Sequence, residues 1–335
     1  MRQIILICFL ALLLNKTFGQ EDGNFTINGN IKGLGDKTIL YLEYTEEEKK
    51  LIDSTIIANG KFKFNGKLKS KAVNAIIRTS NYTNYKFFWL ENSVIDFKAE
   101  KGKFRDAIII GSNNQIKQDE LNKSLKTLSE KEQIKEEQKF VRENPESIIS
   151  AYILSVYSST WGKEITTHLY NNLSEELKNS TYGKSISNFI LLNNNIDIGD
   201  KYVDFLQIDT QNKKVKLSDL DGKVILLEFW GSWCGPCRQT NPELVKVYNE
   251  FKGKGFEIFG VAAESNKEIW LQAIQKDQLT WTNVTDLKGD KNEASLIYGV
   301  SGYPTNFLID KSGVIIAKEL SIKQLRKKLS ELFTK

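Results

Sequence analysis

Cysteine and histidine are scarce in this chain of 335 residues, which contains three cysteines and one histidine. Cys234 and Cys237 are separated by two residues, whereas Cys8 lies near the start of the chain. A pair so close together closes too short a loop to staple a fold. It also supplies only two ligands, and the single histidine, His168, is distant in sequence, whereas structural zinc takes four. A disulfide-stapled scaffold is therefore excluded, and no metal site is expected.

The signals of several other functions are also absent. The formal net charge is only +5, and the charges of both signs are interspersed rather than gathered in a basic stripe, so nucleic acid is not an expected partner. There is no glycine-rich phosphate-binding loop and no Gly-x-Ser-x-Gly nucleophile elbow. We expect neither a metal nor an organic cofactor.

A short apolar run near the N-terminus, residues 4–14, follows a brief basic start. Small residues within 17–19 then match a cleavage site, which predicts a signal peptide over residues 1–19 and an exported protein of the periplasm or cell envelope. The run has roughly half the length of a membrane-spanning helix, which argues against an anchor. Cys8 lies inside the run rather than after a lipobox, which argues against lipid attachment.

Residues 20–112 have the short alternating segments of a small all-β, sandwich-like domain. The Asn59-Gly60 pair is a strong signal for a two-residue hairpin turn. No catalytic constellation is visible in this region. Strands are expected at residues 25–29, 38–44, 56–57, 62–64, 75–78, 86–90, 94–99 and 107–110.

Residues 113–195 are expected to form a helical connector. Residues 115–143 are rich in Lys, Glu, Gln and Leu, which is typical of one long and mostly exposed helix. Their charge run is interpreted as a solvated face with i,i+4 ion pairs, although a partner-binding helix is the alternative. Further helices are expected at 147–158 and across 164–195.

Residues 196–335 alternate between strand and helix patterns, which predicts a mixed sheet flanked by helices. Cys234 and Cys237 lie between a buried strand at 224–230 and a helix that starts near Arg238. A helix N-terminus carries unpaired N–H groups and about half a positive charge, so it stabilises a thiolate and lowers its pKa. This setting predicts a redox dithiol. The other strands are expected at 256–263, 306–310 and 314–317, and the helices at 242–252, 267–276 and 321–333.

The dithiol motif and its surroundings resemble the TlpA/ResA-like branch of the thioredoxin-fold proteins. The resemblance covers about residues 196–333 and is carried by the segments 198–200, 215–223, 227–238 and 298–310. It implies an α/β thioredoxin fold and thiol–disulfide oxidoreductase activity for residues 196–335. The N-terminal part is similar to an uncharacterised domain that precedes such modules in Bacteroidetes proteins.

The resemblance also implies roles for individual residues. Cys234 is expected to be the exposed nucleophile that forms a mixed disulfide, which Cys237 then resolves. Glu228 matches a buried acid that relays a proton for the second cysteine, with a solvent-facing glutamate as the alternative. Pro304 matches a cis-proline that shapes the substrate groove.

Further substrate contacts are expected around the dithiol. The Gly-Pro pair between the cysteines is associated with reducing behaviour, at about −270 mV rather than about −120 mV. In one departure from the branch, Thr240 stands where many members carry a glutamate, so the contribution of that acid is in doubt. The expected substrate-binding residues are Trp233 (for which core packing is the alternative), Gly235, Pro236, Tyr303 and Thr305.

The predicted function is therefore an exported reductase of client protein disulfides, re-reduced by a membrane electron donor. Cysteine pairs awaiting haem attachment in cytochrome c maturation are candidate substrates. One alternative is a peroxiredoxin-like peroxidase, but the residues before Cys234 lack the Pro-x-x-x-Thr-x-x-Cys setting of that chemistry. The other is a ligand-binding protein with a vestigial thioredoxin domain, against which the intact set of motif residues argues.

Overall fold

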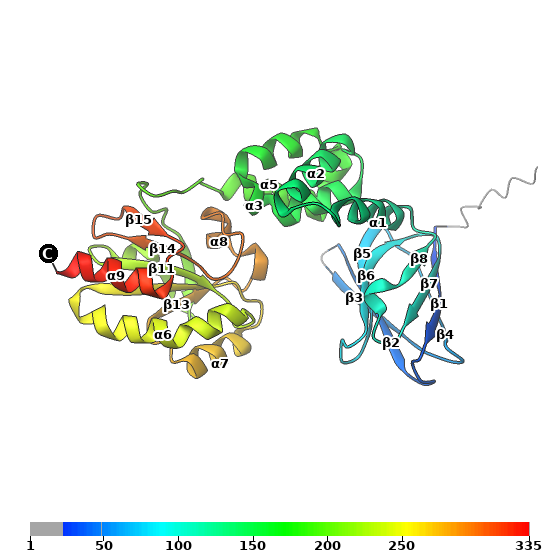
Figure 1. The fold of residues 1–335 in the computed structure, drawn as a ribbon, viewed down its shortest axis with the longest axis horizontal. Coiled ribbons are helices and arrows are strands. Elements are labelled where there is room, and N and C mark those ends of the chain that lie inside the picture. Colours follow the sequence, from blue (N-terminus) through cyan, green and yellow to red (C-terminus); the bar gives the residue numbers. More distant parts are fainter. Residues whose placement is uncertain (1–22, 48, 335) are drawn as a thin grey trace, which may run out of the picture. The chain divides into compact units, whose positions relative to one another are not determined.

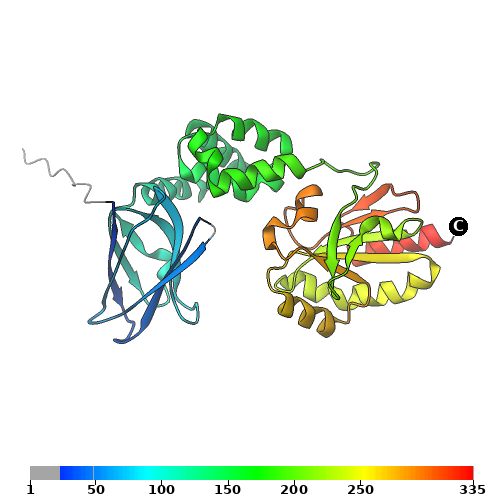
Figure 2. The same ribbon diagram turned by 180° about the vertical axis from the view of Figure 1, so that it is seen from behind.

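The structure is a computed structural model that describes residues 23–47 and 49–334. The predicted signal peptide, residues 1–19, lies outside the described residues. The chain divides after Thr127 into two compact units, which are shown from two sides in Figure 1 and Figure 2. Within the described part of the chain, no helix is both long and apolar enough to cross a membrane.

The first unit is a β-sandwich of two four-stranded sheets, with strand orders β4-β1-β7-β8 and β3-β2-β5-β6. Apolar side chains from both sheets alternate inward and form one core between them. The predicted all-β, sandwich-like domain is confirmed. Its elements are β1 (Phe25–Lys32), β2 (Ile39–Glu46), β3 (Lys49–Ile56), β4 (Lys61–Gly66), β5 (Ala72–Thr79), β6 (Tyr85–Glu91), β7 (Val94–Glu100), β8 (Ile108–Ile110) and α1 (Asn113–Leu125).

The Asn59-Gly60 turn forms, but the predicted hairpin is wrong in its pairing. Both residues have positive φ, 51° and 72°, and Ala58 and Lys61 exchange two backbone hydrogen bonds of 3.0 Å. Beyond this turn, β3 pairs with β2 and β4 pairs with β1, in different sheets. The turn signal is local, and it does not determine which distant strand each flanking segment joins.

The second unit begins with the helices α2 (Glu130–Glu143), α3 (Ile148–Asn172), α4 (Glu175–Asn179) and α5 (Thr181–Leu192). The prediction of one helix over 115–143 is wrong, because α1 ends at Leu125 and α2 starts after Ser129. The Ser129 N–H donates to the Glu132 carboxylate at 2.9 Å, as in a capping box, which explains the new start. Gly162 interrupts α3 with a φ of 80°, a conformation that favours glycine.

A seven-stranded mixed sheet forms the centre of the remaining chain, in the order β10-β9-β13-β12-β11-β14-β15. Helices α6, α7 and α9 pack on one face and α8 packs on the other. This is a thioredoxin fold, which confirms the predicted α/β class. Its elements are β9 (Leu206–Asp209), β10 (Lys214–Lys216), β11 (Val224–Trp230), α6 (Gly235–Phe251), β12 (Phe256–Ala262), α7 (Lys267–Asp277), β13 (Thr282–Thr285), α8 (Glu293–Ile297), β14 (Thr305–Ile309), β15 (Ile315–Lys318) and α9 (Ile322–Phe333).

Strand β11 positions the dithiol. All seven of its residues are buried, and it pairs in parallel with β12 and antiparallel with β14. Leu226 and Trp230 pack with the α6 face of the sheet, so Glu228, which lies between them in the two-residue period, points to the same face. The strand ends at Trp230, and α6 begins only five residues later at Gly235.

Candidate active site

The two cysteines lie at the N-terminus of α6 and are joined by a disulfide. Cys234 is the N-cap residue, and its Sγ accepts a hydrogen bond from the Cys237 N–H at 3.2 Å. Both residues are buried, at 3% and 1% exposure. The expectation of an exposed Cys234 is therefore wrong for this disulfide form, because its sulfur turns inward to Cys237 and to the helix backbone.

Exposed residues form the rim around the buried disulfide. Gly235 and Pro236, the first residues of α6, are exposed, and Trp233 is 57% exposed. The Trp233 indole N–H donates to the Ala263 carbonyl at 2.9 Å, which fixes the ring. A Cβ at Gly231 would lie 2.8 Å from that ring, so glycine provides the space that the indole occupies.

The loop before β14 lies next to this rim. The Tyr303–Pro304 peptide bond is cis, and the Tyr303 ring contacts Trp233 edge-to-face with centroids 5.5 Å apart. The Thr305 hydroxyl donates to the Gly302 carbonyl at 2.8 Å and stabilises the turn. The structure thus places the segments of Trp233 and Pro304, distant in sequence, side by side.

Glu228 is an ionisable residue on the central strand β11, and it is only 7% exposed. Burial raises the pKa of its carboxyl to about 8, although a side-chain hydrogen bond with Asn306 opposes this effect. Asn306 is its cross-strand partner on β14. The carboxyl does not face solvent, and it titrates close to the ordinary pKa of a thiol, about 8.5.

A polar network holds the loop between β11 and α6, and the sequence analysis missed it. The Ser232 N–H donates to the Glu264 carboxylate, and the Ser232 carbonyl accepts from Arg238 Nη1 at 3.0 Å. Arg238 Nη2 donates to Asp277 Oδ1 at 2.8 Å, and Asn241 Nδ2 donates to Asp277 Oδ2 at the same distance. Both backbone polar groups of Ser232 are thereby fixed by side chains.

The Arg238–Asp277 pair is only partly open to solvent, with side chains 24% and 9% exposed. Burial alone raises the pKa of Asp277, but hydrogen bonds from Arg238 and Asn241 outweigh burial and hold the pKa below its ordinary value. Asp277 ends α7, 39 residues after Arg238, so no local pattern indicates the pairing. For Glu264, the one available sequence signal was its place as an acidic residue just after the apolar run of β12.

Thr240 provides no acid, and its hydroxyl is used by the helix. It lies 3.2 Å from the Pro236 carbonyl oxygen and 3.0 Å from that of Cys237, within donor range of both. The side chain is exposed on the first turns of α6. Thr240 therefore contributes a hydrogen bond to the helix backbone and no acidic group.

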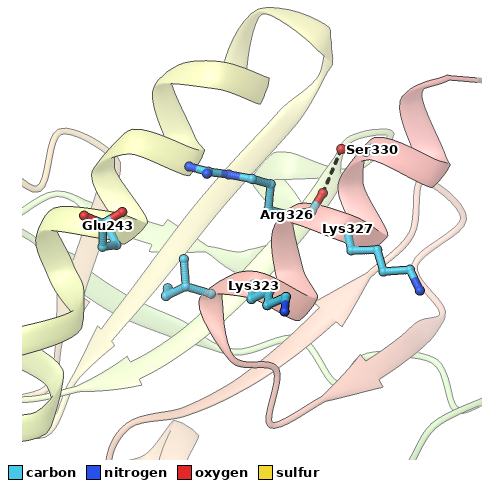
Figure 3. A pocket seen from close by; sticks show the side chains of 6 residues that line it. Glu243, Lys323, Arg326, Lys327 and Ser330 are labelled. Carbon is cyan, nitrogen blue, oxygen red and sulfur yellow. Dashed lines mark hydrogen bonds between the residues drawn. The ribbon is translucent and has the colours of Figure 1, made fainter.

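A surface cavity of about 500 Å³ lies between α6 and α9 (Figure 3). The Ser330 hydroxyl donates to the Arg326 carbonyl at 2.9 Å, and Arg326 pairs with Glu250 at 3.3 Å. His168 lines another open cavity, in the helical segment. Among residues 23–47 and 49–334, no cluster of three His, Cys, Asp or Glu side chains could hold a metal. The first cavity is lined by Glu243, Ile322, Lys323, Arg326, Lys327 and Ser330.

Comparison with known proteins identifies the family of the chain. Residues 198–318 match the AhpC/TSA family, and residues 25–118 match a domain of unknown function, DUF4369. Thiol-disulfide oxidoreductase ResA of Bacillus thuringiensis subsp. konkukian is 34% identical over 140 residues, which are 42% of this chain and 79% of the relative. The chain belongs to the ResA-like thiol–disulfide oxidoreductases.

Other relatives and solved structures match a similar share of this thiol–disulfide oxidoreductase. ResA of Bacillus subtilis is 34% identical over 121 residues, 36% of this chain and 66% of the relative. The thioredoxin domain of a thiol-disulfide oxidoreductase from Bacteroides vulgatus is 35% identical, with a TM-score of 0.39, over 41% of this chain and 99% of that domain. A thiol-disulfide oxidoreductase from Bacteroides fragilis is 32% identical, with a TM-score of 0.38, over 40% and 99%.

Replacing Glu228 should change how stability depends on pH. The pKa of Glu228 is about 8 in the fold against an ordinary 4.5, so between these values the unfolded chain has released a proton that the folded protein keeps. The free energy of unfolding should therefore fall by about 1.4 kcal/mol per pH unit from about pH 5 to about pH 8, relative to Glu228→Gln. Urea unfolding across this range measures the difference. If the free energies of unfolding of the parent and of Glu228→Gln changed in parallel with pH, the raised pKa of Glu228 would be contradicted. Glu243→Gln, at an exposed position, is the control, and its difference from the parent should not change with pH over this range.

Arg238→Met should destabilise the protein, because it keeps the aliphatic stem but leaves the Asp277 carboxylate and the Ser232 carbonyl without their guanidinium partner. We expect a loss of about 1–3 kcal/mol in the free energy of unfolding, below the range for a fully buried pair because Arg238 is partly solvated. Lys246→Met, which breaks the exposed pair with Glu243, should cost less than about 0.5 kcal/mol. Equal losses in urea unfolding would show that the network does not hold the loop.

Proposed function

We propose that this protein reduces disulfide bonds in client proteins through the Cys234–Cys237 dithiol. The single observation that supports this most strongly is the placement of Cys234 as the N-cap of α6, with the Cys237 N–H directed at its sulfur. A thiolate at that position gains a hydrogen bond and the positive end of the helix dipole. Cys234 is therefore the nucleophile of the proposed reaction.

In the first step, the Cys234 thiolate attacks one sulfur of the client disulfide. A bond forms between Cys234 Sγ and that sulfur, the client S–S bond breaks, and the departing client thiolate takes up a proton. Trp233 and the loop that ends in Pro304 border the site of attack. The client chain lies alongside the residues before Pro304 as an added extended strand, with side contacts to Gly235, Pro236, Tyr303 and Thr305.

In the second step, Cys237 loses its proton and its thiolate attacks Cys234 Sγ. The mixed disulfide breaks, the client leaves with its second thiol, and the enzyme holds the Cys234–Cys237 disulfide present in the structure. Glu228 accepts the Cys237 proton in this proposal. Since its pKa of about 8 lies near that of a thiol, the transfer is close to balanced in free energy.

The wider setting follows from the N-terminal sequence. The apolar run of residues 4–14 supports export, so we place the reaction in the periplasm or at the cell envelope. Each turnover consumes two electrons, which a membrane electron donor returns to the dithiol. Cysteine pairs awaiting haem attachment in cytochrome c maturation are the client class that we propose.

Cysteine replacement tests the assigned roles. Cys234→Ser should reduce the rate of insulin disulfide reduction to the uncatalysed level, because no nucleophile remains at the helix N-cap. Cys237→Ser should instead accumulate a covalent client adduct that dithiothreitol releases, which mass spectrometry detects. Ser330→Ala, whose hydroxyl is bound within α9, should retain the parent rate. Parent-level reduction by Cys234→Ser would overturn the proposal.

The reduction potential distinguishes a reductase from an oxidant. Equilibration with dithiothreitol buffers should give a value near about −270 mV, as for thioredoxin-like dithiols, rather than about −120 mV for a strong oxidant. A value at the oxidising end would reverse the proposed direction of electron flow. Peroxide consumption in the presence of reductant, at a rate above that of disulfide reduction, would favour the peroxidase alternative.

A further inference from the structure

Asn306 lies on β14 directly opposite Glu228 on β11, and its side chain contacts two different parts of the fold. Its Oδ1 accepts a hydrogen bond from the Leu320 N–H at 2.9 Å, and its Nδ2 donates to the Leu320 carbonyl at 3.0 Å. Nδ2 carries two protons, so one remains after the bond to Leu320. The Glu228 side chain hydrogen-bonds to the Asn306 side chain, and its carboxyl is the acceptor for this second proton.

The two bonds to Leu320 fix the direction in which the Asn306 amide points. A flipped amide would bring its NH₂ group against the Leu320 N–H and its oxygen against the Leu320 carbonyl. It would also face the Glu228 carboxyl with an acceptor instead of a donor. The main chain adds to this attachment, because the Asn306 carbonyl accepts from the Glu319 N–H at 2.8 Å. The amide donor is therefore already in place before the carboxyl ionises.

Leu320 is itself well anchored. It lies between β15 and α9, and its side chain packs against the apolar core on this face of the sheet. The next residue, Ser321, is the N-cap of α9, and its N–H and hydroxyl both donate to Gln324 Oε1, at 2.9 and 2.7 Å. The donor that faces Glu228 is thus connected to a capped helix end.

Asn306 is an uncharged partner for a buried carboxyl. Burial raises the pKa of Glu228, and the Asn306 hydrogen bond opposes this effect. On β12 the position paired with Glu228 is Gly260, which does not titrate. The cysteines on this face do not titrate in the disulfide form, and burial raises the pKa of both tyrosines above the ordinary 10. The other titratable side chains in or against this core are Cys234, Cys237, Tyr248 and Tyr303.

We propose that Asn306 is a positioning residue for the proton relay, and that it holds the Glu228 carboxylate through the amide proton that Leu320 leaves unused. The relay rests on the proposed function, whereas the contact between the two side chains does not. A hydrogen bond to a charged group is stronger than one to a neutral group, so the donor favours the ionised carboxyl.

The choice of asparagine follows from the sizes of the competing effects. An apolar residue at position 306 would leave the effect of burial unopposed. A lysine or arginine there would lower the pKa of Glu228 by roughly 1–3 units and move it away from that of a thiol. A neutral donor stabilises the carboxylate while it leaves the pKa of Glu228 at about 8.

The amide protons of Asn306 test the contact in the parent protein. In the full chain, in its disulfide form and with ¹⁵N-labelled asparagine, one Nδ2 proton of Asn306 should shift with pH at the midpoint shown by the ¹³C carboxyl resonance of Glu228. The shift should vanish in Glu228→Gln, which also identifies both signals. Asn306 amide signals that stay constant through the Glu228 midpoint would overturn the proposal.

Asn92 is the matched control for this measurement. Its side chain makes the same two bonds with the Leu68 backbone, since Oδ1 accepts from the Leu68 N–H and Nδ2 donates to the Leu68 carbonyl, both at 2.8 Å. It lies in the sandwich, in the other compact unit from Glu228. The Asn92 amide signals should therefore stay constant through the Glu228 midpoint.

Removal of the donor tests its effect on the carboxyl. Asn306→Leu should raise the titration midpoint of Glu228 by about one pH unit, the effect of one hydrogen bond to a charged group. Asn92→Leu removes the corresponding backbone bonds in the sandwich and should leave the midpoint in place. An unchanged midpoint in folded Asn306→Leu would contradict the proposal. If that variant does not fold, the amide titration of the parent decides.

The rate at which Cys237 resolves the mixed disulfide separates this proposal from the proposed function. In single turnovers with insulin, the rise of this rate with pH should move upward in Asn306→Leu together with the Glu228 midpoint, because less of the carboxyl is ionised at each pH. If the midpoint moved and the rate profile did not, the relay role of Glu228 would be overturned, and the positioning role of Asn306 in catalysis with it.

Discussion

The N-cap of α6 is the constraint on which the rest of the site depends. Most helices place a Ser, Thr, Asp or Asn oxygen at this position, and here the Cys234 sulfur replaces it. The sulfur can accept the hydrogen bond from the Cys237 N–H only if the loop that follows Trp230 keeps its conformation. Ser232 is fixed at both its N–H and its carbonyl, by Glu264 and by Arg238. Side chains with no redox chemistry of their own thus determine where the Cys234 sulfur lies.

The face of the seven-stranded sheet that is covered by α6 carries a row of positions with polar side chains within an otherwise apolar core. Asn306, Glu228, Gly260 and Asn283 occupy paired positions on four neighbouring strands. A buried carboxyl and an incompletely satisfied amide lower the stability of the fold. Such a row is expected only where it has a function, because apolar residues at these positions would pack better. The function that fits is a carboxyl whose pKa lies close to that of the thiols.

Sequence reasoning succeeded where the signal was local or strongly periodic. The buried strand β11, the helix α6 and the short strands of the sandwich follow from patterns within a few residues. It failed where partners are distant: the strands beside Asn59-Gly60 join different sheets, and Arg238 meets Asp277 at the end of another helix. The break between α1 and α2 was missed because the Ser129 cap is masked by helix-forming residues on both sides. Likewise, Asn306 meets Glu228 only because β14 and β11 are neighbours in the sheet.

Position 240, on the first turns of α6, carries a threonine rather than an acidic residue. An exposed glutamate on the first turns of α6 would have a pKa of about 4.3 and would remain ionised at neutral pH. It would act mainly as a fixed negative charge, poorly matched for proton exchange with a thiol. The Thr240 hydroxyl instead lies within hydrogen-bond distance of two carbonyl oxygens of the helix. The threonine therefore lacks the negative charge of a glutamate, but no group suited to accept a proton from a thiol is lost. Glu228, with a pKa of about 8, gains and loses its proton over the same pH range as a thiol. In the proposed reaction, proton transfer therefore depends on the interior of the sheet rather than on the surface of the helix.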